Sequence, residues 1–470
     1  MSANEAESGV TDELIAFILE TTYDDLPAEA IEIAKKCIVD GTACMMAGST
    51  EPAADILRAR VAHIGGVEEC HILGKGSMLA PLHMAAQVNG ISGHALDWDD
   101  TALSEEKDRS VLLHPTIQPL TACLAVGEKL DVSAKDFLLA FVLGFEVSVK
   151  IAEAIAPDHF AGGRGYHTSG TIGIFGAMTA SAKLMGLNAE QLSNAFGIAQ
   201  TMAAGVGANH GTMSKPFNMA RACENGVTAA ELAAAGFDGP KNALERGRGF
   251  FEAFGGGYDR TKITGRIGNP FAIIYPGTSI KPYPSGVVGH PAMDAMKVLV
   301  EKHDIQPEDV ESVRVYTGEN VITPGPLRIL HANTELEAKF CVPFQMASMI
   351  LRRKAGLNEF TDEFVQTQEC QDMQRRVTAE LDPEIVALGK GVIVGRIVLT
   401  TKDGKEYTET TAPEYRGGPK NPMTWDEVAD KFKDCAQRVL SDQKTEAFLG
   451  LVKDFETLPD IKGVITNLSA

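Results

Sequence analysis

The chain has 470 residues, of which 44% are hydrophobic, and it carries 43 Lys and Arg against 63 Asp and Glu. This size and composition indicate two or three fully folded domains, and the formal net charge of -20 argues against nucleic acid or an anionic membrane surface as a partner. A small anionic substrate remains compatible with this charge if cationic side chains gather locally.

The N-terminal segment is polar and acidic, and no apolar run is long enough to span a membrane. The eight cysteines are scattered, without a C-x-x-C pair or a Cys/His cluster at metal spacing. The cysteines therefore leave little case for zinc or an iron–sulfur cluster, and we expect a cytoplasmic protein with buried reduced thiols, no membrane partner and no such metal centre.

Residues 11–265 are predicted to be almost entirely helical, because apolar residues recur three and four positions apart. Capping signals mark several helix starts: Pro27, Ser133 followed by Asp136, and Asn188 followed by Gln191. Many of these segments are rich in Ala, Gly and Ser, as in "TIGIFGAMTASAKLMG", which favours close packing on several sides. This region predicts a large helical domain.

The segment 274–286 is punctuated by Pro and Gly and is typical of a domain boundary. Residues 310–318 and 392–411 alternate apolar and polar side chains as strands do, the second with a hairpin turn at Asp403-Gly404, and helices are predicted at 290–304 and 335–353. A capping box from Thr424 to Glu427 opens further helices. The prediction is a mainly α protein, with a helical domain at 1–270 and 415–470 and an inserted α+β lid domain at 271–414.

The stretch "HALDWDDTALSEEKDRSVLLHPT" places Asp97, Asp99 and Asp100 between two histidines. Three functions are open for it: a metal site, an acid catalyst, or a hydrogen-bonded brace for a catalytic site. The D-x-D-D-T order is similar to the acid motif of class II terpene cyclases, but 6% aromatic residues are too few to enclose a carbocation. A magnesium site lacks supporting phosphate-binding loops, and a capped helix end explains only one or two of the aspartates.

Histidines and lysines mark the other candidate segments. His114 precedes a proline and so leaves helical geometry, while His167 lies before a small-residue helix whose N–H groups could receive a carboxylate, with Arg164 nearby as a clamp. Lys215 stands before Pro216 at a loop-to-helix junction. The alternatives are structural histidines in loops and a solvated surface lysine.

The boundary segment itself is the last candidate. Lys281, Tyr283 and Ser285 alternate with prolines there, so a stiff backbone would present their side chains at the edge of a cleft. The alternative for this segment is an ordinary proline-rich linker.

Taken together, "NGISGHALDWDDT", "LLHPT", "GYHTSGTIGIFGA", "GTMSKPFNMARACENG" and "SIKPYPSGVVGHPAMDA", in that order, resemble the MmgE/PrpD family over nearly the whole chain. That family includes 2-methylcitrate dehydratase, cis-aconitate decarboxylase and an iminodisuccinate epimerase, and the resemblance implies a homodimer with a helical domain and a lid. It also implies one cleft between the domains, lined by Asp97, Thr101, His114, His167, Lys215 and Lys281.

Two departures from the family pattern stand out. The charged segment "ALSEEKDRSVLL", residues 102–113, is inserted between the aspartate motif and His114. The decarboxylase pattern has a histidine in the lid segment shortly after the lysine and proline, whereas this chain has Ser285 and Gly286 there. The second departure makes decarboxylation a weaker expectation than dehydration.

The resemblance implies a cofactor-independent reaction on a small polycarboxylate, in which a carbanion forms next to a carboxylate. Lys215 and Lys281 would hold the carboxylates, and His167 would act as general base or acid with His114 as its partner. Asp97 would orient a histidine or lysine, and Thr101 would hydrogen-bond Asp97 or the substrate. A dehydratase of 2-methylcitrate type is the first expectation. The alternatives are an epimerase with His114 and His167 as opposed bases, a decarboxylase, and a protein that binds a polycarboxylate without turning it over.

Overall fold

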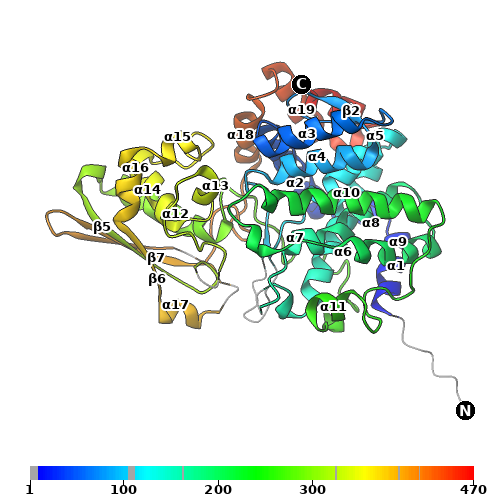
Figure 1. Ribbon diagram of the computed structural model, residues 1–470, viewed down its shortest axis with the longest axis horizontal. Helices are drawn as coiled ribbons and strands as arrows, with labels where there is room; N and C mark the ends of the chain where they lie inside the picture. The colour runs from blue at the N-terminus through cyan, green and yellow to red at the C-terminus, as the bar shows by residue number, and fades with distance from the viewer. Residues whose placement is uncertain (1–8, 104–111, 161–162, 323–324, 390–391, 412) are drawn as a thin grey trace, which may run out of the picture.

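The structure is a computed structural model that describes residues 9–103, 112–160, 163–322, 325–389, 392–411 and 413–470. Two hydrophobic cores organise these residues. The larger core draws on residues from Val10 to Ile280 and from Met423 to Leu468, together with Leu357. The smaller core draws on residues from Tyr283 to Leu399. Figure 1 shows the two bodies side by side, one helical and one with strands, so the expected fold class is confirmed.

The helices of the larger body come from both ends of the chain. They are α1 (Val10–Glu20), α2 (Ala28–Gly48), α3 (Pro52–Ile64), α4 (Leu82–His94), α5 (Ile117–Leu130), α6 (Ala134–Ala154), α7 (Thr168–Thr171), α8 (Gly173–Leu184), α9 (Ala189–Met202), α10 (Ser214–Ala234), α11 (Phe250–Gly255), α18 (Trp425–Ala436), α19 (Asp442–Lys453) and α20 (Lys462–Leu468). Two short antiparallel pairs accompany them, β1 (Cys70–Ile72) with β2 (Met78–Ala80) and β3 (Ala102–Leu103) with β4 (Leu112–Leu113).

Small residues let these helices approach closely. At the end of α2, a Cβ added to Gly48 would overlap the carbonyl oxygen of Ser92 in α4. The expected caps are present: Ser133 accepts from the Asp136 backbone at the start of α6, and a reciprocal capping box joins Asn188 to Gln191. Such tight contacts fix the position of α4, whose last residue is His94.

The expectation of continuous helix up to residue 265 is wrong after Ala234. Turns dominate from 235 to 286, interrupted by α11 and one short 3₁₀ segment at Arg260–Lys262. The physical reason is the glycine content of this segment, where Gly236, Gly256 and Gly257 adopt positive φ angles of 92°, 75° and 148° that a helix cannot contain. The β1–β2 hairpin was also not expected.

The smaller body is built on a four-stranded sheet of order β6-β5-β7-β8. Its elements are α12 (His290–Lys302), β5 (Val310–Thr317), α13 (Glu335–Ala338), α14 (Val342–Arg352), α15 (Asp362–Val365), α16 (Gln368–Arg375), β6 (Val377–Leu381), α17 (Pro383–Ala387), β7 (Gly395–Thr401) and β8 (Glu406–Thr410). β5 runs parallel to β6 and antiparallel to β7, and β7 and β8 form the hairpin expected at Asp403-Gly404, where Gly404 has a φ of 83°.

The C-terminal helices α18 to α20 pack with the larger body. Figure 1 places α18 and α19 near α2, and both helices contact α2. The Thr424 to Glu427 capping box opens α18 as expected. In the described part of the chain no helix combines the length and apolar character needed to cross a bilayer.

Candidate functional site

The aspartate motif begins where α4 ends. Asp97 has a left-handed backbone with a φ of 54°, a conformation that Asp tolerates better than most residues, and its carbonyl and carboxylate are both used in contacts described below. Further along, the backbones of Thr101 and Ser279 exchange hydrogen bonds of 3.0 and 2.9 Å. This pairing joins the aspartate motif to the segment that leads into the smaller body, and so brings Lys281 to Asp97.

Two lysines from distant segments meet at Asp97. The Lys215 ammonium, in the first turn of α10, pairs with Oδ1, and the Lys281 ammonium lies 3.3 Å from Oδ2 and donates to the Asp97 carbonyl oxygen at 2.7 Å. All three side chains are buried, with at most 5% of any of them exposed. Burial opposes ionisation of Asp97, but the Lys215 and Lys281 charges outweigh it and hold the pKa of this carboxyl well below its usual value.

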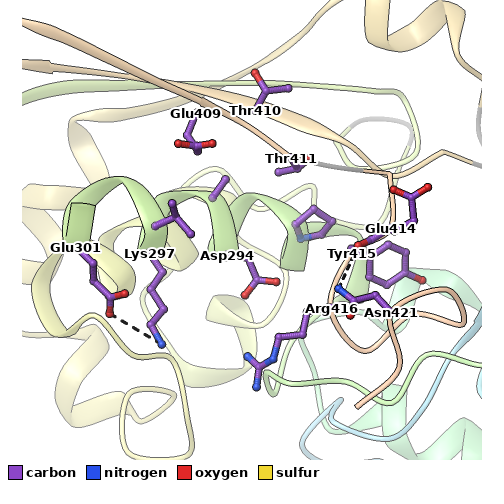
Figure 2. Close-up of a pocket in the computed structure, with 13 residues that line it drawn as sticks. Asp294, Lys297, Glu301, Glu409, Thr410, Thr411, Glu414, Tyr415, Arg416 and Asn421 are labelled. Carbon is purple, nitrogen blue, oxygen red and sulfur yellow. Dashed lines mark hydrogen bonds and ion pairs between the residues drawn. The ribbon is translucent and has the colours of Figure 1, made fainter. Parts of the chain in front are cut away.

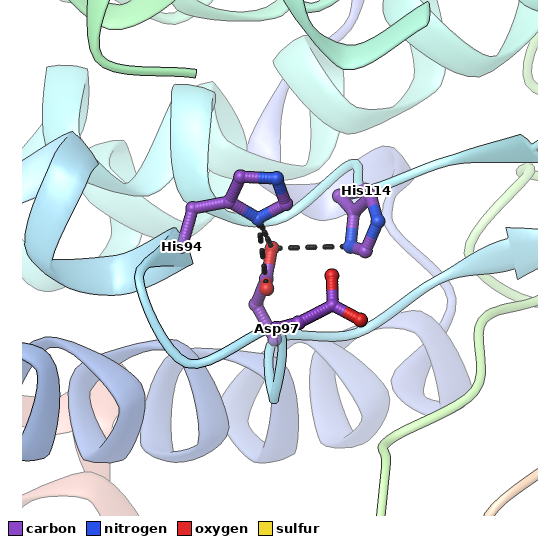
Figure 3. Close-up of side chains that lie close together, drawn as sticks. His94, Asp97 and His114 are labelled. Carbon is purple, nitrogen blue, oxygen red and sulfur yellow. Dashed lines mark hydrogen bonds and ion pairs between the residues drawn. The ribbon is translucent and has the colours of Figure 1, made fainter. Parts of the chain in front are cut away.

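Asp99 contacts two imidazoles, those of His94 and His114, which Figure 3 labels together with Asp97. Nδ1 of His94 is 2.9 and 2.8 Å from its two oxygens, and Nδ1 of His114 is 3.2 Å from Oδ2. Burial raises the pKa of Asp99, yet the two histidines outweigh it and the pKa lies well below the usual value. Burial lowers the pKa of His94 to about 3 and also lowers that of His114, so both rings are neutral and Asp99 is ionised.

His167 forms the N-cap of the short helix α7. Its Nδ1 accepts a 3.2 Å hydrogen bond from the Gly170 backbone N–H, and its ring centroid lies 5.8 Å from that of His94. Burial, followed by the nearby Lys215 charge, holds the pKa of His167 well below its usual value. The ring is therefore neutral and lies edge-on to the His94 ring, and the centroids of the His94 and His114 rings are 4.6 Å apart.

The structure thus gathers five of the predicted residues, Asp97 itself included, around Asp97 and Asp99. Lys215 and Lys281 contact Asp97, and His114 contacts Asp99. The fifth, Thr101, makes a long 3.5 Å contact from its hydroxyl to Nδ1 of His114. His167 joins them through the His94 ring. Ionised carboxylates, ammonium groups and neutral imidazoles therefore share one buried cluster at the junction of the two bodies.

Three predicted residues point elsewhere. Arg164 is exposed and donates to the Ala253 carbonyl oxygen at 2.9 Å. The Tyr283 hydroxyl donates to Asp294 of α12 at 2.5 Å, and the Ser285 hydroxyl lies 3.2 Å from Nε2 of His290. The structure does not bring these side chains into contact with the lysine and imidazole cluster.

Sequence reasoning missed several members of the cluster. His94 and Asp99 stood in the quoted motif, and their spacing of five residues across a helix end was a usable signal. Asp40 and Lys431 were not signalled at all, because they come from α2 and α18 and meet only in the fold, where they form a buried ion pair of 2.5 Å. The inserted segment 102–113 begins with β3 and ends with β4, which pair with each other, and its residues 104–111 lie outside the described residues.

Oxygen and nitrogen atoms of His94, Asp97, Asp99 and His114 lie within 4.8 Å of one another, which is close enough to consider a metal ion. The charges around these four residues do not favour a metal ion. Asp97 is already paired with two ammonium groups, and both histidine Nδ1 atoms are directed at Asp99. A cation would have to enter beside Lys215 and Lys281, so these residues fit an internal hydrogen-bond network better than a metal site.

A separate pocket lies on the smaller body, between α12, β8 and the segment 414–421 (Figure 2). It measures about 480 Å³, and its lining includes four acidic residues against Lys297 and Arg416: Asp294, Glu301, Glu409 and Glu414. None of the predicted site residues lines it. Its acidic character makes it a poor receptor for a carboxylate, so it is not the candidate site.

Comparison with known proteins identifies the family of the chain. The MmgE/PrpD N-terminal domain matches residues 12–262 and the MmgE/PrpD C-terminal domain matches residues 283–457. The chain is 26% identical over 483 residues to a cis-aconitate decarboxylase from Aspergillus terreus, covering 99% of this chain and 96% of that protein. It is 25% identical over 412 residues to the cis-aconitate decarboxylase of Homo sapiens, covering 84% of this chain and 81% of that protein. Since the two family domains together span most of its length, the chain belongs to the MmgE/PrpD family.

Proposed function

We propose that this protein is a cofactor-independent lyase that acts on a small polycarboxylate by removing a proton next to a carboxylate. The observation that carries the proposal is the meeting of Lys215 and Lys281, both buried, beside three neutral imidazoles. Burying ammonium groups is costly unless they are paired. Asp97 supplies one carboxylate for two ammonium groups, which leaves N–H donors for the carboxylates of a substrate.

The chemistry explains why such a cluster is useful. A C–H bond beside a carboxylate is a very weak acid, because the electron pair left on carbon must spread onto an already anionic group. Ammonium groups held against that carboxylate stabilise the developing enolate, and the low dielectric of a buried site strengthens the effect. A neutral imidazole can then accept or return the proton at physiological pH.

Dehydration of a 2-methylcitrate-like acid is the first reaction that we propose. Decarboxylation of a cis-aconitate-like acid is the second candidate, favoured by the names of the relatives in Aspergillus terreus and Homo sapiens. Where the decarboxylase pattern has a histidine, this chain has Ser285 and Gly286, and Ser285 contacts His290 and not the lysine and imidazole cluster. This difference supports dehydration over decarboxylation. The homodimer implied by the resemblance belongs to the same proposal, and its mass in solution would test it.

The experiment is a substrate panel on metal-stripped protein: 2-methylcitrate, cis-aconitate and iminodisuccinate, followed by ultraviolet absorbance, carbon dioxide release and optical rotation. Proton exchange with deuterated solvent detects abstraction without net turnover, and binding without exchange or product would identify a binding protein. Lys215→Met and His167→Ala should each lower kcat/KM by about 10²-fold or more. Lys405→Met, at a turn residue that is 68% exposed, is the matched control. Near-full turnover by both site variants would overturn the proposal.

A further inference from the structure

The three imidazoles of the cluster differ in the hydrogen-bond partner of Nδ1: a carboxylate for His94 and His114, and a backbone N–H for His167. Nδ1 of His94 and Nδ1 of His114 both face Asp99, at 2.8 and 3.2 Å from Oδ2. An ionised carboxylate has no hydrogen to donate, so each nitrogen that bonds to it must carry the proton. In a neutral ring this leaves Nε2 as an unprotonated lone pair on His94 and on His114.

His167 has the opposite arrangement. Its Nδ1 faces the backbone N–H of Gly170 at 3.2 Å, and a backbone N–H can only donate. Nδ1 of His167 must therefore be the unprotonated nitrogen, and the single proton of this neutral ring is at Nε2. The preceding backbone is fixed as well, because the His167 N–H donates to the Gly205 carbonyl oxygen at 3.1 Å.

We propose that Asp99 and the Gly170 N–H fix opposite tautomers on His114 and His167, which makes His114 the general base and His167 a hydrogen-bond donor to the substrate. This inference rests on the proposed lyase function and deepens it. His114 and His167 are then catalytic residues, while Asp99 acts through His114 and is a positioning residue. His94 shares the same carboxylate, and its own Nε2 has no partner among the described residues.

The assignment gives a balanced elimination. Nε2 of His114 takes the proton from the carbon beside the carboxylate, and the C–H electron pair moves into an enolate held by Lys215 and Lys281. The imidazolium of His114 is paired with Asp99 during this step. The enolate electrons then form the carbon–carbon double bond as the hydroxyl group leaves, and the hydroxyl takes the proton back from His114 and departs as water. His167 donates a hydrogen bond from Nε2 to the departing oxygen and keeps its proton throughout.

The test reads the tautomers directly. Nitrogen-15 spectra of protein labelled only at its 11 histidines distinguish a protonated from an unprotonated ring nitrogen, and His94→Gln, His114→Gln and His167→Gln identify the signals. We expect Nδ1–H on His94 and His114 and Nε2–H on His167. An Nε2–H tautomer on His114, or Nδ1–H on His167, in the unsubstituted protein would overturn the inference, whether or not any substrate is turned over.

Asp99→Asn supplies the second readout. Its amide oxygen can still accept from both Nδ1–H groups at the position of Oδ2, but the amide carries no charge to pair with the imidazolium that forms on His114 during turnover. We expect kcat to fall about 10²-fold with KM changed less than about threefold. Asp100→Asn is the matched control, because Asp100 contacts the hydroxyl groups of Thr116 and Thr278 at 2.9 and 2.6 Å and, within the described residues, no imidazole. An unchanged kcat in Asp99→Asn would contradict the role of Asp99.

The two proposals fail in different ways. If the panel of acids gives no turnover and no deuterium exchange, the lyase function fails, but the tautomers are still measured on the unliganded protein. If turnover is found while His114 carries its proton on Nε2, the lyase function stands and this assignment fails.

Discussion

The Lys431 ammonium donates a 3.0 Å hydrogen bond to the backbone carbonyl oxygen of Lys281. The same group donates to the carbonyl oxygen of Trp98 at 2.8 Å and lies 4.7 Å from the centre of the Trp98 ring. Its counter-ion is Asp40 of α2, which is fully buried and has no other hydrogen-bond partner among the described residues. One ammonium group from a C-terminal helix therefore holds both segments that meet at Asp97.

Lys431→Met should be strongly destabilising, because it leaves the Asp40 carboxylate buried without its partner. Breaking a buried pair in this way costs about 3–5 kcal/mol of unfolding free energy. The double variant Asp40→Asn/Lys431→Met removes both charges and should recover most of that loss, which urea denaturation would measure. Its kcat/KM should stay below that of the parent, since the Trp98 and Lys281 carbonyls still lack their donor. A double variant as unstable as the single one would contradict this account.

Asp100 should make the protein less stable as the pH rises through the weakly acidic range. Burial, opposed in part by the Thr278 hydrogen bond, raises its pKa from 3.8 to about 7. Between these values the folded state keeps a proton that the unfolded state has lost, so the unfolding free energy falls with increasing pH, by at most about 1.4 kcal/mol per pH unit. Asp100→Asn cannot ionise and should lack this contribution, which urea titrations across that range would show. An identical slope in both proteins would contradict the prediction.

Gly48→Ala should destabilise the fold and disturb the site together. The added methyl group would meet the Ser92 carbonyl oxygen of α4, two residues before His94, and backbone cannot move aside as a flexible side chain can. We expect a loss of about 1–3 kcal/mol in unfolding free energy, with a lower kcat. Gly450→Ala is the control: Gly450 lies in α19, is exposed and has open space around its Cβ position, so alanine should stabilise by up to about 1 kcal/mol. Equal effects at the two positions would argue against close helix contact as the cause.

Local signals in the sequence predicted the local structure well. The caps at Ser133, Asn188 and Thr424 and the turn at Asp403-Gly404 depend on residues a few positions apart, and each is confirmed. The meeting of Lys215 with Asp97 spans 118 residues, and its prediction needed the family resemblance because no local rule links the two segments.

The parts that the sequence did not reveal depend on tertiary structure. Asp40 and Lys431 each occur in an ordinary helical pattern, and only the return of α18 to α2 turns them into a buried pair. The break after Ala234 was missed because helical periodicity continued to be inferred through glycines that adopt positive φ. The tautomers of His114 and His167 follow from which atom faces Nδ1, and motif spacing does not contain that information.

For Arg164, the sequence motif and the contacts in the structure predict different contributions to substrate binding. Its position three residues before His167 suggested a carboxylate clamp, whereas its side chain is exposed and donates to the Ala253 carbonyl oxygen. An exposed arginine that bonds one backbone oxygen contributes little to a buried site. We therefore expect Arg164→Ala to leave KM for the true substrate within about twofold, while Lys215→Met raises KM or lowers kcat by far more. A tenfold or larger rise in KM for Arg164→Ala would restore the clamp and show that the 163–167 segment changes position when substrate binds.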